Sequence, residues 1–222
     1  MTNEEMLSHV DHTQLKAFAT WEDIVKICDE AVQYNCASVC IPPTYIARVH
    51  SAYPMLNICT VVGFPLGYAV TEAKVAETER ALADGCNEID MVVNISDVKN
   101  GDYLMVEEEI RTLKAVCGGH ILKVIIETCY LTDEEKIEMC RAVTNAGADF
   151  IKTSTGFGTD GATVKDIELF KEHIGPGVKI KAAGGVSTLE DLEKFIELGC
   201  ERVGTSRAVG LVAGKVSASN TY

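Results

Sequence analysis

Eight short apolar segments alternate with longer amphipathic segments along the 222 residues, and this alternation predicts an α/β fold. Eight successive βα units favour parallel strands closed into a (β/α)8 or TIM barrel. No Pro-, Gly- or Ser-rich linker divides the chain, and its length is typical of a single barrel domain. We therefore expect one domain over residues 1–222, with a short polar tail at about 215–222. An open, doubly wound sheet is the alternative.

The predicted strands are short runs of apolar or β-branched residues. They cover residues 9–12, 37–41, 57–63, 88–94, 120–127, 149–154, 178–184 and 202–205. A helical pattern follows each of them, as repeated βα units require.

The predicted helices cover residues 21–34, about 43–51, 70–85, 103–116, 132–146, 162–173, 188–198 and about 207–214. Helix starts are indicated by the residue pair 71–72, by T-x-x-E at 132–135 and by S-x-x-E at 187–190. Three helices run into a glycine before the next strand, where a left-handed C-terminal cap is expected. These glycines occur in ADGCNEI (83–89), NAGADFI (145–151) and ELGCERV (197–203).

Charge and composition exclude several classes of protein. The formal net charge of −13 argues against nucleic acid or an anionic membrane as partner, because both need a basic face. Any phosphate must then be bound locally, by a few lysines and backbone amides. The start, MTNEEMLSHV, lacks the features of a signal peptide. The most apolar stretch, ICTVVGFPLGYAV, is too short and too interrupted by Gly and Pro to span a membrane.

The cysteines and histidines do not predict a metal site. Nine cysteines form no C-x-x-C pair, and most lie in apolar stretches. They indicate reduced, buried thiols in a cytoplasmic protein rather than a disulfide or zinc framework. The five histidines show no ligand cluster, so neither a metal nor another cofactor is expected.

Three charged residues interrupt the predicted strands where a barrel carries its active face. Lys152 ends the strand 149–154, Lys181 lies late in 178–184, and Asp90 lies within 88–94. Functional side chains of such barrels project from the C-terminal ends of the strands. A single buried lysine is as readily a salt-bridged or snorkelling charge. Three convergent charges favour a catalytic site.

Lys152 and Lys181 belong to consecutive strands, so their ammonium groups are expected to approach each other. Two ammonium groups in a dry site disfavour each other's protonation, and a neutral lysine is a nucleophile toward carbonyl carbons. Asp90 would then hold the remaining cation or transfer protons. Lys179 is interpreted as a solvated charge at the start of its strand; as the partner of Lys152 it is the alternative.

Glycines around the predicted loops suggest a phosphate site. GFGTDG (156–161) satisfies the G-x-G-x-x-G pattern of dinucleotide-binding turns, but no acidic residue ends the next strand, so this function is not predicted. GGVS (184–187) and GTS (204–206) follow the seventh and eighth strands, where barrel loops often bind phosphate through backbone N–H groups. Gly156 is expected to join them. Ordinary turn glycines are the alternative.

Five motifs, in order and spread over nearly the whole chain, resemble those of deoxyribose-phosphate aldolases. They are DHTQL (11–15), CTVVGFPLG (59–67), EIDMVVN (88–94), FIKTSTGF (150–157) and VKIKAAGGV (178–186). Members of this family are class I aldolases on (β/α)8 barrels. The resemblance implies reversible cleavage of 2-deoxy-D-ribose 5-phosphate to acetaldehyde and D-glyceraldehyde 3-phosphate through a lysine Schiff base, in deoxyribose catabolism.

The resemblance also implies roles for single residues. It assigns the Schiff-base lysine to Lys152, the second active-site lysine to Lys181 and the proton-handling aspartate to Asp90. It places Asp11 and Cys40 at the pocket. The residues that match its substrate and phosphate region are Thr155, Gly156, Gly184, Gly185, Gly204, Thr205 and Ser206.

Two positions need separate treatment. Many members carry arginine where this chain has Ser187, and Arg207 is a candidate to replace that phosphate contact. Tyr222 is a candidate to reach the site, as a terminal tyrosine does in some members. A homodimer or higher homo-oligomer is consistent with the resemblance. The alternative functions are another Schiff-base phosphosugar aldolase or transaldolase, and a non-catalytic phosphosugar-binding barrel.

Overall fold

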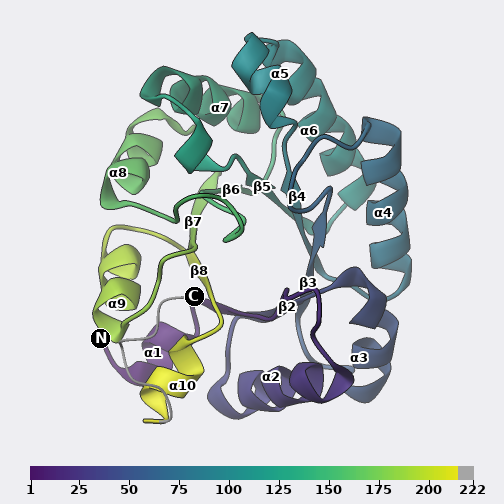
Figure 1. The fold of residues 1–222 in the computed structure, drawn as a ribbon, viewed down its shortest axis with the longest axis vertical. Helices are drawn as coiled ribbons and strands as arrows, with labels where there is room; N and C mark the ends of the chain where they lie inside the picture. Colours follow the sequence, from purple (N-terminus) through teal and green to yellow (C-terminus); the bar gives the residue numbers. More distant parts are fainter. Residues whose placement is uncertain (215–222) are drawn as a thin grey trace.

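The computed structural model describes residues 1–214 and contains a closed barrel of eight parallel strands in chain order (Figure 1). Each strand overlaps its predicted segment. The strands are β1 (Val10–Thr13), β2 (Ser38–Ile41), β3 (Ile58–Val62), β4 (Glu88–Val92), β5 (Ile121–Ile125), β6 (Phe150–Lys152), β7 (Lys179–Ala183) and β8 (Arg202–Thr205). Because β1 pairs with β8, the barrel is confirmed and the open sheet is wrong.

The helices form a ring around the barrel (Figure 1). They are α1 (Asn3–Leu7), α2 (Trp21–Tyr34), α3 (Ile46–Ala52), α4 (Thr71–Ala83), α5 (Ile95–Asn100), α6 (Tyr103–Cys117), α7 (Asp133–Asn145), α8 (Val164–His173), α9 (Leu189–Glu197) and α10 (Ala208–Val212). Two 3-10 turns are η1 (Pro43–Tyr45) and η2 (Thr128–Tyr130). The sequence pattern did not predict α1, α5 or η2, since segments of one or two turns show too little periodicity to be recognised.

Helix starts were predicted with mixed success. Thr132 caps α7 in a reciprocal box with Glu135, as expected. The prediction for α9 is wrong by one residue, because Thr188 and Asp191 offer the same spacing and form the box instead. The helix α4 begins at Thr71 with Glu72 in its first turn, as the pair predicted, although its N-cap, Val70, makes no side-chain cap.

Glycines end three of the helices as predicted. Gly85, Gly147 and Gly199 follow α4, α7 and α9 with φ of 104°, 75° and 102°. These left-handed values favour glycine and turn the chain back toward the next strand.

The barrel interior carries charges where apolar side chains are usual. Most TIM barrels fill this space with branched apolar residues. Here the buried residues on the strands include Asp11, Asp90, Lys123, Lys152 and Lys181. The apolar core lies largely between the barrel and its helices. These buried charges therefore indicate that the functional site lies in the barrel interior.

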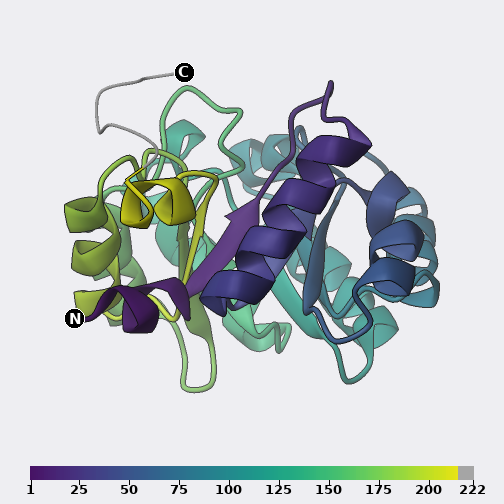
Figure 2. The same ribbon diagram turned by 90° about the horizontal axis from the view of Figure 1, so that it is seen from below.

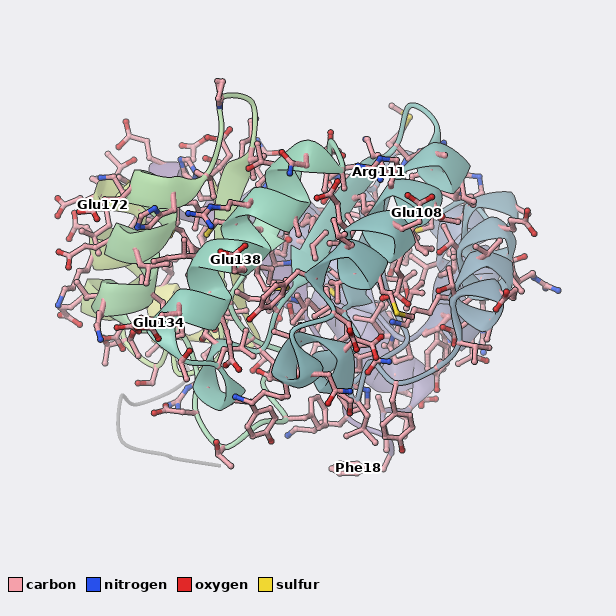
Figure 3. The ribbon with its side chains drawn as sticks, turned by 90° about the horizontal axis from the view of Figure 1, so that it is seen from above. Phe18, Glu108, Arg111, Glu134, Glu138 and Glu172 are labelled. Carbon is pink, nitrogen blue, oxygen red and sulfur yellow. The ribbon has the colours of Figure 1, made fainter. Side chains whose placement is uncertain are left out.

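The loops that follow β1 and β6 rise on the same side of the barrel (purple and green in Figure 2). Negative charge lies elsewhere: Figure 3 shows Glu108, Glu134 and Glu172 on the outer faces of α6, α7 and α8. Phe18, with 79% of its surface exposed, lies at the edge of the molecule that carries these loops.

Within residues 1–214, no helix combines the length and apolarity needed to cross a membrane. All nine cysteines are free, and most are buried.

Candidate active site

Lys152 and Lys181 lie next to each other on neighbouring strands, as predicted. The register of β6 and β7 places them opposite each other. Their Nζ atoms are each 2.7 Å from Oδ2 of Asp90, which comes from β4. All three side chains are buried, and Lys152 retains an exposed fraction of 3%. The structure thus brings together the three charges that interrupt the apolar strands.

Asp11, on β1, supplies a second carboxylate to Lys181. The two side chains form an ion pair. Oδ1 of Asp11 lies 2.7 Å from Nη1 of Arg202 and accepts a hydrogen bond of 2.8 Å from Ser38 Oγ. These contacts fix the carboxylate inside the barrel, where it stabilises the charge of Lys181.

Lys123 and Glu88 complete the cluster, and the sequence analysis did not identify them. Nζ of Lys123 lies 2.6 Å from Glu88, 2.8 Å from Asp90 and 3.4 Å from Asp11. Glu88 also forms two contacts of 3.0 Å with Arg202. A signal was present, because Lys123 interrupts the apolar strand HILKVIIE in the same way that Lys152 interrupts its own.

The cluster holds three carboxylates and four basic groups. The carboxylates are Asp11, Glu88 and Asp90, and the basic groups are Lys123, Lys152, Lys181 and Arg202. Burial opposes ionisation of Asp90, but the surrounding lysines, Lys123 first, hold the pKa of this carboxyl well below its usual range. Burial also opposes the charge of Lys181, but Asp11 and Asp90 raise its pKa above the usual range. Lys181 is therefore a stable cation.

Cys40 and Cys59 face each other across β2 and β3. Their sulfur atoms and an oxygen of Asp90 lie within 4.8 Å of one another, as metal ligands would. Lys123 already provides a cation there, since its Nζ is 3.2 Å from Cys59 Sγ and 2.8 Å from Asp90 Oδ1. The site is thus built for an ammonium group. Burial raises the pKa of the Cys59 thiol well above its usual range, which keeps that thiol protonated.

A cavity of about 630 Å³ opens over Lys152. The predicted residues that line it are Lys152, Thr155, Gly156, Gly184, Gly185, Gly204, Thr205, Ser206 and Arg207. Asp90, Lys181, Asp11 and Cys40 are buried in the barrel and are not among the lining residues. The end of β1 and the β1–α2 loop also line the cavity, with residues that the sequence did not single out: Thr13, Gln14, Leu15, Lys16 and Phe18.

The wall of this cavity is positive in an acidic protein. Its basic residues are Lys16, Lys152 and Arg207, and within residues 1–214 no carboxylate lines it. The formal net charge of the whole chain is −13. A small anion would therefore find local positive potential here.

Two of the glycines of GFGTDG, Gly158 and Gly161, serve loop packing. A Cβ atom on Gly161 would lie 2.3 Å from the carbonyl carbon of Gly184 and 2.7 Å from the nitrogen of Gly185. Gly184 and Gly185 have φ of 74° and 73°. Gly161, the third glycine of the apparent dinucleotide-binding pattern, thus allows the loops after β6 and β7 to touch. This packing explains why glycine occurs there without a bound dinucleotide.

The remaining residues that the sequence singled out are Ser187, Arg207, Lys179 and Tyr222. Ser187 bonds Asp191 through its amide and hydroxyl, so it serves the start of α9 while it lines the cavity. Arg207 lines the cavity. Lys179 is exposed in a surface ion pair, as expected. Tyr222 lies outside the described residues.

Comparison with known proteins places the chain in a family. Residues 6–219 match the sequence model of the DeoC/LacD family aldolases. A deoxyribose-phosphate aldolase of Clostridium botulinum is 71% identical over 216 residues, which are 97% of this chain and 98% of the relative. The chain belongs to the DeoC/LacD aldolase family.

Solved structures of DeoC/LacD-type aldolases have the same barrel. A putative deoxyribose-phosphate aldolase from Coccidioides immitis is 36% identical with a TM-score of 0.92, over 96% of this chain and 87% of the other. The deoxyribose phosphate aldolase from Aeropyrum pernix, described as tetrameric, is 29% identical with a TM-score of 0.89, over 96% of this chain and 92% of the other. The family that the five sequence motifs suggested is therefore supported by structural similarity over 96% of the chain.

Proposed function

We propose that the chain catalyses the reversible cleavage of 2-deoxy-D-ribose 5-phosphate to acetaldehyde and D-glyceraldehyde 3-phosphate. One observation carries the proposal: a buried lysine, Lys152, borders a positive cavity and shares the carboxylate of Asp90 with the cationic Lys181. The high identity to a relative named for this reaction supports the same substrate.

The balance of charge favours Lys152 as the nucleophile. Loss of one proton from an ammonium group would leave the cluster with three cations for its three carboxylates. Lys181 contacts both Asp11 and Asp90, whereas among the described residues Lys152 contacts only the carboxylate of Asp90. Lys152 therefore has the least ionic stabilisation. Its neutral amine also meets the cavity, where a carbonyl carbon would bind.

The proposed mechanism uses all three residues. Neutral Lys152 attacks the C1 aldehyde of the sugar, and loss of water gives an iminium ion. This ion accepts the electron pair as the bond between C2 and C3 breaks, while the carboxylate of Asp90, held by the cationic Lys181, takes the proton of the C3 hydroxyl through a water molecule and D-glyceraldehyde 3-phosphate is released. The enamine is then protonated at C2, and hydrolysis of the imine releases acetaldehyde and restores the lysine.

The phosphate group is proposed to bind among the loops after β6, β7 and β8, which line the cavity together. Gly184 and Gly185 carry no side chain, so an anion can approach their backbone closely, whereas Gly204 lines the cavity from within β8. Arg207 and Lys16 would add charge from the cavity wall. These contacts would hold the sugar with its C1 end toward Lys152.

We also propose a single catalytic domain in a cytoplasmic enzyme. The barrel closes on itself from β1 to β8, and the free, buried thiols suit a reducing compartment. A homo-oligomer is proposed because the Aeropyrum pernix relative is described as tetrameric. Light scattering coupled to size-exclusion chromatography would measure the state of this chain.

Borohydride reduction in the presence of acetaldehyde tests the mechanism. Reduction should trap an ethyl group on Lys152, located by peptide mass analysis. A panel of phosphosugars should show cleavage of 2-deoxyribose 5-phosphate in preference to ketose phosphates, which separates this function from a transaldolase. Adducts on other lysines alone would contradict the assignment of Lys152 as the Schiff-base lysine. The absence of any adduct would also contradict it and would favour a non-catalytic barrel.

A further inference from the structure

Glu127 is a buried carboxylate beside the candidate active site that the proposed mechanism does not use. It follows β5 and retains an exposed fraction of only 2%. Its φ of 51° makes it one of two non-glycine residues within 1–214 in the left-handed region. Such a conformation is strained for a non-glycine residue. A side chain kept there despite burial and strain needs an explanation.

The carboxylate is bound by one residue of the cavity wall. Thr155 donates its backbone N–H to Glu127 Oε1 at 3.1 Å, and its hydroxyl donates to Oε2. The same hydroxyl accepts a hydrogen bond of 2.9 Å from the amide of Phe157. Both oxygens of Glu127 therefore hold the turn at 155–157.

Gly158 closes this arrangement. A Cβ atom on it would lie 3.0 Å from Cδ of Glu127 and 2.9 Å from Cys129 Sγ. The loop thus wraps around the carboxylate from Thr155 to Gly158, which leaves no room for a side chain at the last position. Thr155, Gly156, Phe157 and Gly158 all line the cavity, and Glu127 does not.

The backbone on either side of Glu127 is tied to the end of β6. The amide of Ile126 donates to the carbonyl of Lys152 at 3.1 Å, and the amide of Thr128 donates to that of Thr153 at 2.9 Å. Glu127 is therefore anchored at the same place as Lys152. Its strained backbone aims the side chain across to the following loop.

We infer that Glu127 is a positioning residue that shapes the loop 155–158 for the phosphate group of the substrate, an inference that rests on the proposed function. It acts through Thr155 and touches neither the substrate nor the reacting atoms. Its loss should weaken binding of the phosphorylated substrate and leave formation of the Schiff base at Lys152 largely intact.

The test compares Glu127→Gln with wild type on 2-deoxyribose 5-phosphate and on 2-deoxyribose. Glutamine keeps the size but replaces one acceptor with an N–H₂ group that faces a donor of Thr155. KM for the phosphorylated sugar should rise by about tenfold, as expected for loss of one charge-assisted hydrogen bond. The value of kcat/KM for 2-deoxyribose and the rate of acetaldehyde trapping should change by less than about twofold, since no contact to Lys152 is removed.

Glu109→Gln is the matched control. Glu109 is also a buried carboxyl, paired with Lys74 between α4 and α6, and it does not line the cavity. Its replacement should lower stability without a change in preference for the phosphorylated sugar. Equal loss on both sugars in Glu127→Gln, or an unchanged KM, would overturn the inference.

Thr155→Val supplies a second route if Glu127→Gln does not fold. It removes the hydroxyl that joins Glu127 to Phe157, so it should raise KM for the phosphorylated sugar. In the double variant the two effects should not add, because they break the same contact; full additivity would contradict the inference. A wild-type protein without an adduct on Lys152 would instead refute the proposed function.

Discussion

Asp90 is one carboxylate shared by three lysines, and this arrangement determines how single substitutions act. Its Oδ2 lies 2.7 Å from both Lys152 and Lys181, and its Oδ1 lies 2.8 Å from Lys123. Removing any one lysine leaves two cations for the carboxylate. The charge of Asp90 therefore remains compensated, whereas the proton distribution among the lysines changes.

Lys152→Leu should abolish cleavage and acetaldehyde trapping while the barrel stays folded. Leucine suits a barrel interior, and Lys123 and Lys181 remain to compensate Asp90. Circular dichroism and thermal melting would verify the fold. Lys179→Leu is the control, because this lysine is exposed and paired at the surface, so activity should stay near that of wild type. Residual turnover in Lys152→Leu would refute the assigned nucleophile.

Lys181→Leu should lower the rate near neutral pH. Without this cation, Asp90 would stabilise the ammonium form of its remaining partners more strongly, so less neutral amine would be available. The alkaline pH needed for half-maximal activity should therefore move upward. A pH–rate profile measures the shift, and a profile that keeps its position at lower amplitude would contradict this role.

At the scale of elements, strand positions follow from local sequence and several helix ends do not. Each strand is a short apolar run, and burial on both faces makes that pattern visible without tertiary information. The N-cap of α9 lies one residue after the predicted one, because two overlapping pairs of residues offer the spacing of a capping box. Only the packed structure shows that Thr188 is the N-cap. The short α5 has no periodicity to detect.

The contact between the loops after β6 and β7 can be tested at Gly161. Gly161→Ala places a methyl group 2.3 Å from a backbone carbon of Gly184, so the two loops must separate. We expect a loss of about 1–3 kcal/mol in unfolding free energy and a higher KM for the phosphorylated sugar. Gly119→Ala is the control, since nothing lies within 4 Å of its added Cβ. Equal stability of the two variants in urea unfolding would show that the contact is dispensable.

The buried charge cluster affects the whole molecule through pH. Burial opposes ionisation of Asp11 and Glu88, but Lys123 and the other nearby cations hold the pKa of both carboxyls below the usual value. The same holds for Asp90. A carboxyl with a lowered folded pKa stabilises the fold above its unfolded pKa of about 4 and loses this contribution as pH falls.

The free energy of unfolding should therefore decrease as pH falls below about 5, with the main loss below about 4. Urea unfolding at a series of pH values measures this. Asp11→Asn removes one of the carboxyls with a lowered pKa, so its stability should depend less steeply on pH in the acid range. An equal slope in the variant would show that the acid sensitivity arises outside the cluster.

The amino-acid order was sufficient for the barrel, the pair Lys152 and Lys181, and Asp90, because apolar runs mark strands and a charge within such a run is conspicuous. Lys123 carried the same mark, yet its importance became visible only when the structure showed it paired with Glu88, Asp90 and Asp11 inside the barrel. Glu127 ends the predicted strand 120–127, but its local sequence does not indicate what the carboxylate binds. Its carboxylate accepts a hydrogen bond from Thr155, 28 residues later. Contacts between distant segments depend on packing, so they cannot be inferred from the pattern of either segment alone.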